Sequence, residues 1–257
     1  MAQNKKMKDY HQHVYEYVRN DFLNPKISSI KFSEFIKKNN LLETNKGICI
    51  DLGSGPGSGT YYLAKQFPDI EFLGIDYNKK LIDWLKNFLK QNDGKKFNLK
   101  NLRIEFGDWN QPKEIIKKFK NKNLQTVISV HSLCTQKNFE EAASKIIKLN
   151  PNKIVFNSLF YEGPLDVRIH INDRNSNLED DNPDADFNIH SLNAARAYLK
   201  SKGYTKIIFE KFDIGTNLPK PINGERGTYT INSDFGKYTQ FSGPVHLPWY
   251  FVAAIKN

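Results

Sequence analysis

Short apolar runs alternate with amphipathic segments along most of this chain. The apolar runs predict strands at 47–52, 71–76, 102–106, 126–130, 153–158, 206–212 and 249–255. Between these runs, apolar residues recur every three or four positions, which predicts helices over 59–67, 78–91, 112–120, 138–148 and 190–202. Because strands that alternate with helices form right-handed βαβ units, we expect an α/β fold with a doubly wound, mostly parallel sheet.

Three segments depart from this alternation. The first, 1–44, precedes the first strand and is expected to form an N-terminal helical cap, with helices over 8–22 and 28–40. The apolar face of the helix over 8–22 consists of Tyr10, Val14, Tyr17, Val18 and Phe22. Segments 160–188 and 213–248 have no regular period, so we expect them to be long loops, and loops of this length are functional or disordered.

The two long loops differ in composition. In the first, Arg168 and His170 alternate with apolar neighbours, as on the outward face of a short strand. The second is rich in proline and aromatic residues, which favours an ordered cover over a pocket.

A glycine-rich turn follows the first predicted strand, with the sequence Asp51-Leu-Gly-Ser-Gly-Pro-Gly57. Glycine adopts positive φ angles and allows a ligand to approach the backbone, and the helix that follows presents free N–H groups. The next strand also ends in an acid, Asp76, which is placed to accept hydrogen bonds from ribose hydroxyls. Because ligands of parallel sheets bind beyond the carboxyl ends of the strands, the sequence predicts a nucleotide-like ligand there.

These motifs resemble those of the class I S-adenosylmethionine-dependent methyltransferases. Segment 51–57 is similar to the first motif of that family, 74–77 to the second and 107–109 to the motif that contacts adenine, while 130–133 lies where the family lines the methyl donor. The resemblance covers about residues 45–160. It implies a seven-stranded sheet of order 3-2-1-4-5-7-6 with the last strand antiparallel, and S-adenosyl-L-methionine as the cofactor.

The resemblance also implies roles for single residues. Asp51 would hold the amino-acid end of the cofactor, directly or through backbone and water, Asp76 would bind the ribose hydroxyls, and Asp108 would accept from the adenine amino group. Tyr77 or Trp109 would pack on the adenine ring. The competing interpretation is that Asp51 and Asp76 are turn residues at strand ends. The full implied cofactor-binding set is Asp51, Gly53, Ser54, Gly55, Gly57, Asp76, Tyr77, Asp108, Trp109 and His131.

Candidate residues for the methyl acceptor follow the fourth and fifth strands. Methyl transfer needs alignment and desolvation, and it needs a base only if the nucleophile is protonated. His131 is the main candidate for a base or a substrate contact, although it could equally be a hydrogen-bonded histidine beside the cofactor. Tyr161 and Glu162 are further catalytic candidates, and Asp166 either orients the acceptor or caps the loop.

Aromatic residues provide the remaining candidates for the acceptor pocket. Tyr15 on the first helix, Tyr229 and Trp249 are expected, with Tyr161 and Asp166, to bind the substrate, while core packing is the competing explanation for each aromatic residue. Together they predict an enclosed pocket for a small or flat molecule. We therefore expect one domain over 1–257: the cap 1–44, a cofactor-binding half 45–160 and a substrate-side half 161–257 with both insertions. No metal site is expected.

Charge changes this interpretation little. The formal net charge is +10, but the lysines are scattered over helix faces, which is typical of a solvated surface rather than a nucleic-acid footprint. No apolar run approaches about 18 residues, so no membrane partner is expected. Two cysteines suit a reducing compartment, and we expect a cytoplasmic monomer or homodimer.

The sequence thus favours methyl transfer to an oxygen, nitrogen or sulfur atom of a small molecule. RNA methylation is an alternative whose only support is the charge, because the chain has no Asn/Asp-Pro-Pro-Tyr/Phe segment after the fourth strand. Methylation of a protein or peptide, and a non-catalytic subunit that binds S-adenosylmethionine, remain further alternatives. A nicotinamide-dependent reductase is the weakest competitor.

Overall fold

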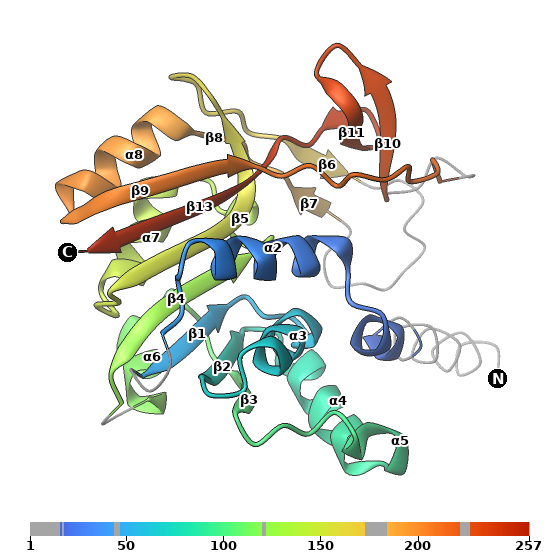
Figure 1. Cartoon of the computed structure of the whole chain (residues 1–257), viewed down its shortest axis with the longest axis vertical. Coiled ribbons are helices and arrows are strands. Elements are labelled where there is room, and N and C mark those ends of the chain that lie inside the picture. Colours follow the sequence, from blue (N-terminus) through green and yellow to red (C-terminus); the bar gives the residue numbers. More distant parts are fainter. Residues whose placement is uncertain are drawn as a thin grey trace. The chain divides into compact units, whose positions relative to one another are not determined.

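The computed structural model describes residues 16, 18–43, 47–119, 122–172, 184–221 and 227–256 (Figure 1). The chain divides into two compact units, 1–125 and 126–257, and each is described by itself below. Tyr15, which the sequence assigns to the substrate, lies outside the described residues, as do Tyr10 and Tyr17 of the same predicted helix.

The first unit contains three parallel strands in the order β3-β2-β1, as the sequence predicts for its first three strands (Figure 1). The strands are β1 (Ile48–Leu52), β2 (Glu71–Asp76) and β3 (Leu102–Phe106). The helices are α2 (Ile27–Lys38), α3 (Ser58–Gln66), α4 (Lys79–Lys90), α5 (Asn92–Lys95) and α6 (Pro112–Lys118), of which only α5 was not expected. All five residues of β1 are buried, so its carboxyl end emerges from the core directly into the glycine turn.

Local sequence explains where two of these helices begin. Asn78 stands at the N-cap of α4, where its side chain accepts a hydrogen bond from the backbone N–H of Leu81 at 3.1 Å. Pro112 occupies the first turn of α6, where its missing N–H leaves no hydrogen bond unmade.

The described part of the N-terminal cap is anchored in an aromatic cluster. Val18 and Phe22, in the helical stretch 18–23, pack with Tyr61 of α3, Phe88 of α4 and Phe97. The Phe22 ring centroid lies 5.2 Å from those of Tyr61 and Phe97. Burial of a large apolar side chain contributes about 1.5–3 kcal/mol, so this cluster fixes the helical stretch against α3 and α4.

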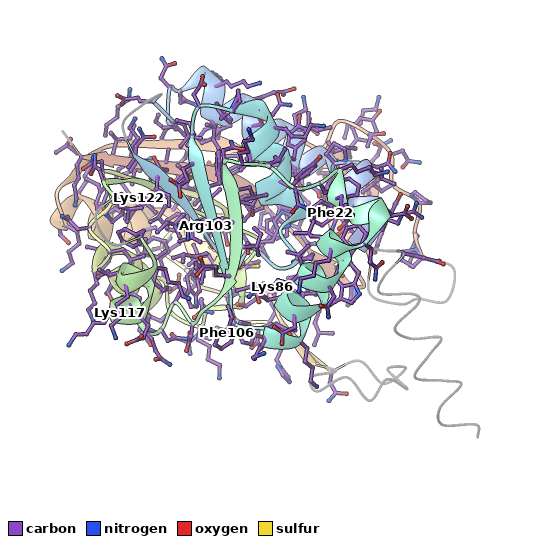
Figure 2. The ribbon with its side chains drawn as sticks, turned by 90° about the horizontal axis from the view of Figure 1, so that it is seen from below. Phe22, Lys86, Arg103, Phe106, Lys117 and Lys122 are labelled. Carbon is purple, nitrogen blue, oxygen red and sulfur yellow. The ribbon has the colours of Figure 1, made fainter. Side chains whose placement is uncertain are left out.

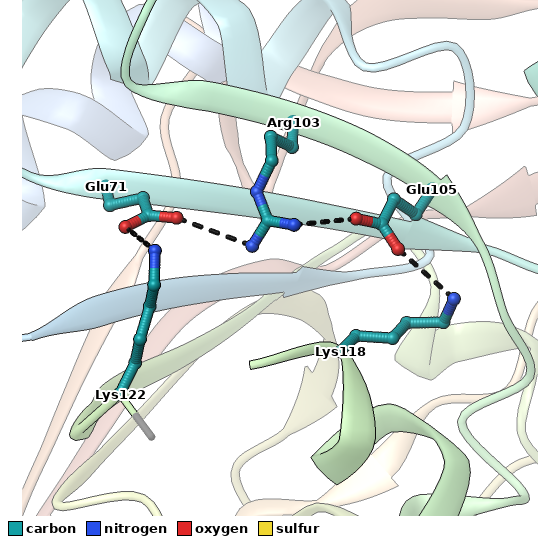
Figure 3. A network of polar contacts seen from close by, with 5 residues as sticks. All are labelled: Glu71, Arg103, Glu105, Lys118 and Lys122. Carbon is teal, nitrogen blue, oxygen red and sulfur yellow. Dashed lines mark hydrogen bonds and ion pairs between the residues drawn. The ribbon is translucent and has the colours of Figure 1, made fainter. Parts of the chain in front are cut away.

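The outer strand β3 carries a network of ion pairs (Figures 2 and 3). Arg103 donates to Glu105 at 2.8 Å and lies 3.4 Å from Glu71, while Lys118 lies 3.2 Å from Glu105 and Lys122 pairs with Glu71. These side chains are partly exposed, so each pair contributes no more than about 1 kcal/mol. Charged side chains such as Arg103 and Glu105 on the last strand of a sheet discourage pairing with another chain. Lys118 and Lys122 neutralise Glu105 and Glu71, which gives these lysines a local explanation without nucleic acid.

The second unit contains β4 (Leu124–Val130, which begins at the boundary), β5 (Lys153–Tyr161), β9 (Tyr204–Lys211) and β13 (Trp249–Lys256). Their order is β4-β5-β13-β9, which matches the predicted 4-5-7-6. β4 and β5 are parallel, whereas β13 runs antiparallel to both neighbours, as predicted for the last strand. The fold class is thereby confirmed.

Helices and one short strand complete this unit. They are the 3-10 helix η1 (Leu133–Thr135), α7 (Phe139–Ile147), α8 (Leu192–Ser201) and β8 (His190–Ser191), which pairs with the end of β5. Within the described residues, no helix is long and apolar enough to cross a membrane.

The prediction that 213–248 is a loop was wrong. The segment folds into an antiparallel sheet of β10 (Thr228–Ser233), β11 (Gly236–Ser242) and β12 (Val245–His246). The two longer strands bury adjacent residues, such as Tyr229 and Thr230, rather than every second residue. The sequence therefore lacks the alternation of apolar and polar residues by which a strand is predicted. Segment 160–188 contains a shorter hairpin, β6 (His170–Asn172) with β7 (Asp184–Asp186), and His170 is exposed on it as expected.

Candidate active site

The glycine turn between β1 and α3 has the backbone that the sequence predicts. Gly53, Gly55 and Gly57 have φ angles of 77°, 55° and 82°, in the left-handed region that favours glycine. A Cβ at Gly57 would lie 2.7 Å from the Ile104 side chain, whereas a Cβ at Gly55 would meet no atom of the described residues within 4 Å. The turn is therefore packed tightly at Gly57 and is open at its centre, beside Gly55.

Asp76 closes this turn from β2. Its Oδ2 accepts from the backbone N–H of Gly55 and its Oδ1 from that of Asn78, both at 2.8 Å. The residue is 8% exposed, and a carboxylate oxygen that accepts one hydrogen bond keeps capacity for another. Asp76 therefore organises the loop and still has acceptor capacity for hydroxyl groups of a ligand.

Asp51 lies in the core at the end of β1, and only 3% of its surface is exposed. Its Oδ2 accepts from the Thr60 hydroxyl at 2.6 Å, whereas none of the described residues donates to its buried Oδ1. Burial raises the pKa of Asp51 to about 7, with the Thr60 hydrogen bond lowering it and the nearby Asp76 raising it further. An under-bonded carboxyl at this position needs a physical explanation beyond packing.

The end of β3 holds the residues that the resemblance assigns to the adenine ring. Asp108 forms a turn in which its Oδ1 accepts from both the backbone and the side-chain nitrogen of Asn110, each at 2.8 Å. Trp109 is partly buried, and Tyr77, after β2, is 73% exposed. Asp108 thus has a structural task whether or not it also binds a ligand.

In the second unit, His131 follows β4 in a strained conformation. Its φ of 60° is uncommon for a residue with a side chain, and residues held in this region cluster at functional sites. Asn157 of β5 holds it twice: the Asn157 carbonyl accepts from the His131 backbone N–H at 2.8 Å, and the Asn157 Nδ2 lies 3.0 Å from His131 Nε2. The Trp249 ring centroid lies 4.5 Å from that of His131, so two predicted site residues meet here.

Glu162 does not join this group. The Tyr250 hydroxyl donates to Glu162 Oε1, and the pKa of Tyr250 is raised by burial and by this carboxylate. On β13, Tyr250 is adjacent to Trp249 and therefore points to the opposite face of the sheet. The structure pairs Glu162 with Tyr250 and leaves His131 with Asn157 and Trp249.

Two other predicted substrate residues have structural partners. Asp166 Oδ1 accepts from the backbone N–H of Ser191, the N-cap of α8, at 2.7 Å, so it caps the loop. Tyr229 is 8% exposed and donates to the Gly243 carbonyl at 2.7 Å, inside the β10–β12 sheet. Tyr161 remains 46% exposed at the end of β5 and is open to contact with a ligand.

Sequence reasoning missed two residues of these groups. Thr60 belongs to the first turn of α3 and is fully buried, and the signal for it was a hydroxyl on an apolar helix face beside a buried acid. Asn157 is a fully buried amide in the middle of β5, where a polar group requires a partner. Within the described residues, no group of three or more His, Cys, Asp or Glu side chains could hold a metal ion.

Comparisons with known proteins agree with this geometry. Residues 45–132 match the sequence model of a family described as "Putative methyltransferase". No curated protein matches the chain. Among solved structures, the N-terminal domain of EvdMO1 with SAH bound is 9% identical, with 89% of this chain and 81% of that chain covered and a TM-score of 0.52. The glycopeptide N-methyltransferase MtfA is 11% identical, with 91% and 92% covered and a TM-score of 0.50.

At these identities the solved structures establish the fold. Together with the family match over 45–132, which contains the glycine turn and both later acids, they confirm the resemblance that the motifs indicated.

Proposed function

We propose that this chain, which has the class I methyltransferase fold and a methyltransferase segment over 45–132, transfers a methyl group from S-adenosylmethionine to a small molecule. The acceptor atom is an oxygen, nitrogen or sulfur. One observation carries the proposal: three left-handed glycines follow β1, and the middle one faces open space beside the carboxylate of Asp76.

The residues of the first unit fit the parts of this cofactor. Gly53, Ser54, Gly55 and Gly57 give it a path close to the backbone, and Asp76 has acceptor capacity for the two ribose hydroxyls. Asp51 supplies negative charge near the amino-acid end. Tyr77 or Trp109 covers the adenine ring, and Asp108 accepts from its amino group.

The cofactor supplies an electrophilic methyl group on a positively charged sulfur, and the chain supplies alignment and proton handling. The bond from carbon to sulfur breaks as the bond from the acceptor atom to carbon forms. An acceptor that carries a proton must lose it, and His131 takes that proton.

Asn157 suits His131 to this task. Nε2 lies 3.0 Å from the Asn157 amide, so the lone pair that takes the proton has to be on Nδ1. With the amide oriented so that its Oδ1 accepts from Nε2–H, the neutral ring carries this lone pair on Nδ1, and the same Oδ1 stabilises the ring once it is charged. Trp249 holds the imidazole by ring packing, and Tyr161 provides exposed aromatic surface for the acceptor.

The test has two stages. Calorimetric titration with S-adenosylhomocysteine should show binding by the wild-type chain and much weaker binding by Asp76→Asn, while Asp83→Asn, which alters a half-exposed carboxylate on α4, serves as the matched control. A screen of small-molecule pools should then show formation of S-adenosylhomocysteine and a product heavier by one methyl group.

The outcomes separate the alternatives. Absence of cofactor binding at millimolar concentration would overturn the proposal. Binding without turnover in any pool would favour a non-catalytic subunit, and methylation of RNA or peptide alone would replace the small-molecule acceptor.

A further inference from the structure

Thr60 and Asp51 form a polar pair inside an otherwise apolar core. Thr60, in the first turn of α3, is fully buried, and its hydroxyl donates to Asp51 Oδ2 at 2.6 Å. The pair joins the strand and the helix that flank the glycine turn. No motif of the sequence analysis includes Thr60.

The backbone N–H groups of the glycine turn donate to other acceptors. The N–H groups of Gly53 and Ser54 donate to the carbonyl of Ile75, and that of Gly55 donates to Asp76. Among the described residues, none donates to Asp51 Oδ1, although this oxygen is buried. Since buried acceptors in proteins nearly always have a partner, this oxygen points to a donor outside the part of the chain that the structure describes, such as a ligand.

We propose that Thr60 is a positioning residue that fixes the Asp51 carboxylate so that its Oδ1 receives the α-ammonium group of the cofactor, directly or through a water molecule. This inference rests on the proposed function, because it assumes that S-adenosylmethionine binds at the glycine turn. Oδ1 has almost no exposed surface, so the ammonium group reaches it through water or a small movement of the turn. The left-handed glycines and the open space beside Gly55 allow such a movement.

The charge of Asp51 makes the arrangement sensitive to pH. Burial raises its pKa to about 7 and the Thr60 hydrogen bond opposes this, while Asp76 of β2 acts on it electrostatically and raises the pKa further. The Cys49 thiol of β1 is neutral, because burial and Asp51 raise its own pKa. A protonated carboxyl attracts an ammonium group weakly. Loss of the Thr60 hydroxyl should raise the pKa of Asp51 further and therefore move the loss of affinity to higher pH.

Comparing two ligands separates the contact of Asp51 with the α-ammonium group from the binding of adenine and ribose. S-adenosylhomocysteine carries the amino-acid end, whereas 5′-methylthioadenosine has the same adenine and ribose without it. The affinity of the wild type for both ligands is measured by calorimetry from pH 6 to pH 8.5, together with Thr60→Val and Thr60→Ser. We expect Thr60→Val to weaken S-adenosylhomocysteine binding about tenfold at neutral pH, because a hydrogen bond to a charged group is lost.

The same variant should leave 5′-methylthioadenosine within about twofold of the wild type, and Thr60→Ser should restore both affinity and pH profile because it keeps the hydroxyl. In the wild type alone, the affinity ratio of the two ligands should fall as pH drops below 7. Equal weakening of both ligands, or a ratio that does not change with pH, overturns the inference. Wild type that binds neither ligand contradicts the proposed function instead.

Discussion

Replacing Asp51 by asparagine should remove a dependence of stability on pH that the structure assigns to this residue. Asparagine has the same shape, and its Oδ1 can still accept from Thr60. The change removes the charge of a residue that is 3% exposed. None of the described residues donates a hydrogen bond to its Oδ1. Because the group is buried, solvent screens its charge little.

The magnitude follows from the two pKa values of Asp51. Its ordinary pKa is 3.8, and burial raises the pKa in the folded chain to about 7. The folded state therefore holds the proton more tightly than the unfolded state. The stabilisation is complete below about pH 4 and is lost as pH rises through 7, and three pH units correspond to about 4 kcal/mol of unfolding free energy.

The assay is urea unfolding followed by circular dichroism at intervals from pH 4 to pH 8. The difference in unfolding free energy between wild type and Asp51→Asn should change by about 4 kcal/mol over this range, with the variant gaining relative stability as pH rises. Asp93→Asn, in which a carboxylate that is 61% exposed is altered, is the matched control and should shift stability by no more than about 0.5 kcal/mol. Parallel curves for wild type and Asp51→Asn would refute the reasoning.

Three further changes test the packing and the strain described above. Gly57→Ala should destabilise the chain by about 1–3 kcal/mol more than Gly203→Ala in urea unfolding, since both glycines have φ above 80° but only Gly57 would place its Cβ 2.7 Å from a side chain. Equal losses of unfolding free energy in the two variants would show that backbone strain, and not the close contact of the Cβ, destabilises Gly57→Ala. Phe22→Ala should cost about 3–5 kcal/mol and Leu23→Ala, 48% exposed, less than about 1 kcal/mol; a small loss at Phe22 would mean that the helical stretch is not anchored. His131→Gly should be more stable than His131→Ala by about 1 kcal/mol because glycine tolerates a φ of 60°, while both variants lose methyl transfer to a protonated acceptor; equal stability would remove the case for strain.

The sequence predicted the parallel strands well because each is a short apolar run bounded by polar residues. β2 and β3 have the predicted bounds, and β1 begins one residue later than expected. β5 extends to Tyr161, beyond the predicted 153–158, because its last residues pair with β8 and β13, which local pattern does not reveal. The β10–β12 sheet was missed because its two longer strands bury adjacent residues, so the burial pattern does not alternate along them.

The same distinction between local pattern and distant contact applies to the residues of the candidate site. The glycine turn was predictable because positive φ angles restrict the residue type, and Asp76 because it ends a strand beside that turn. The hydrogen-bond partners of Asp51 and His131 could not be predicted. The contact of Thr60 with Asp51 spans nine positions, that of Asn157 with His131 spans 26, and neither spacing belongs to a helix or hairpin pattern.

Two unsatisfied polar atoms give an independent reason to place function at the glycine turn. In the first unit, Asp51 Oδ1, Ser54 Oγ and Arg19 Nε are buried without a hydrogen-bond partner among the described residues, and the first two border the glycine turn. In the second, the same holds for Ser129 Oγ near the carboxyl end of β4, for Asn157 Oδ1 and Ser158 Oγ in the middle of β5, and for Asn188 Nδ2. Each such atom costs about 1–3 kcal/mol, which packing alone would not retain. Because ligands of parallel sheets bind beyond the carboxyl ends of the strands, a polar ligand at the glycine turn would supply the hydrogen bonds that Asp51 and Ser54 lack.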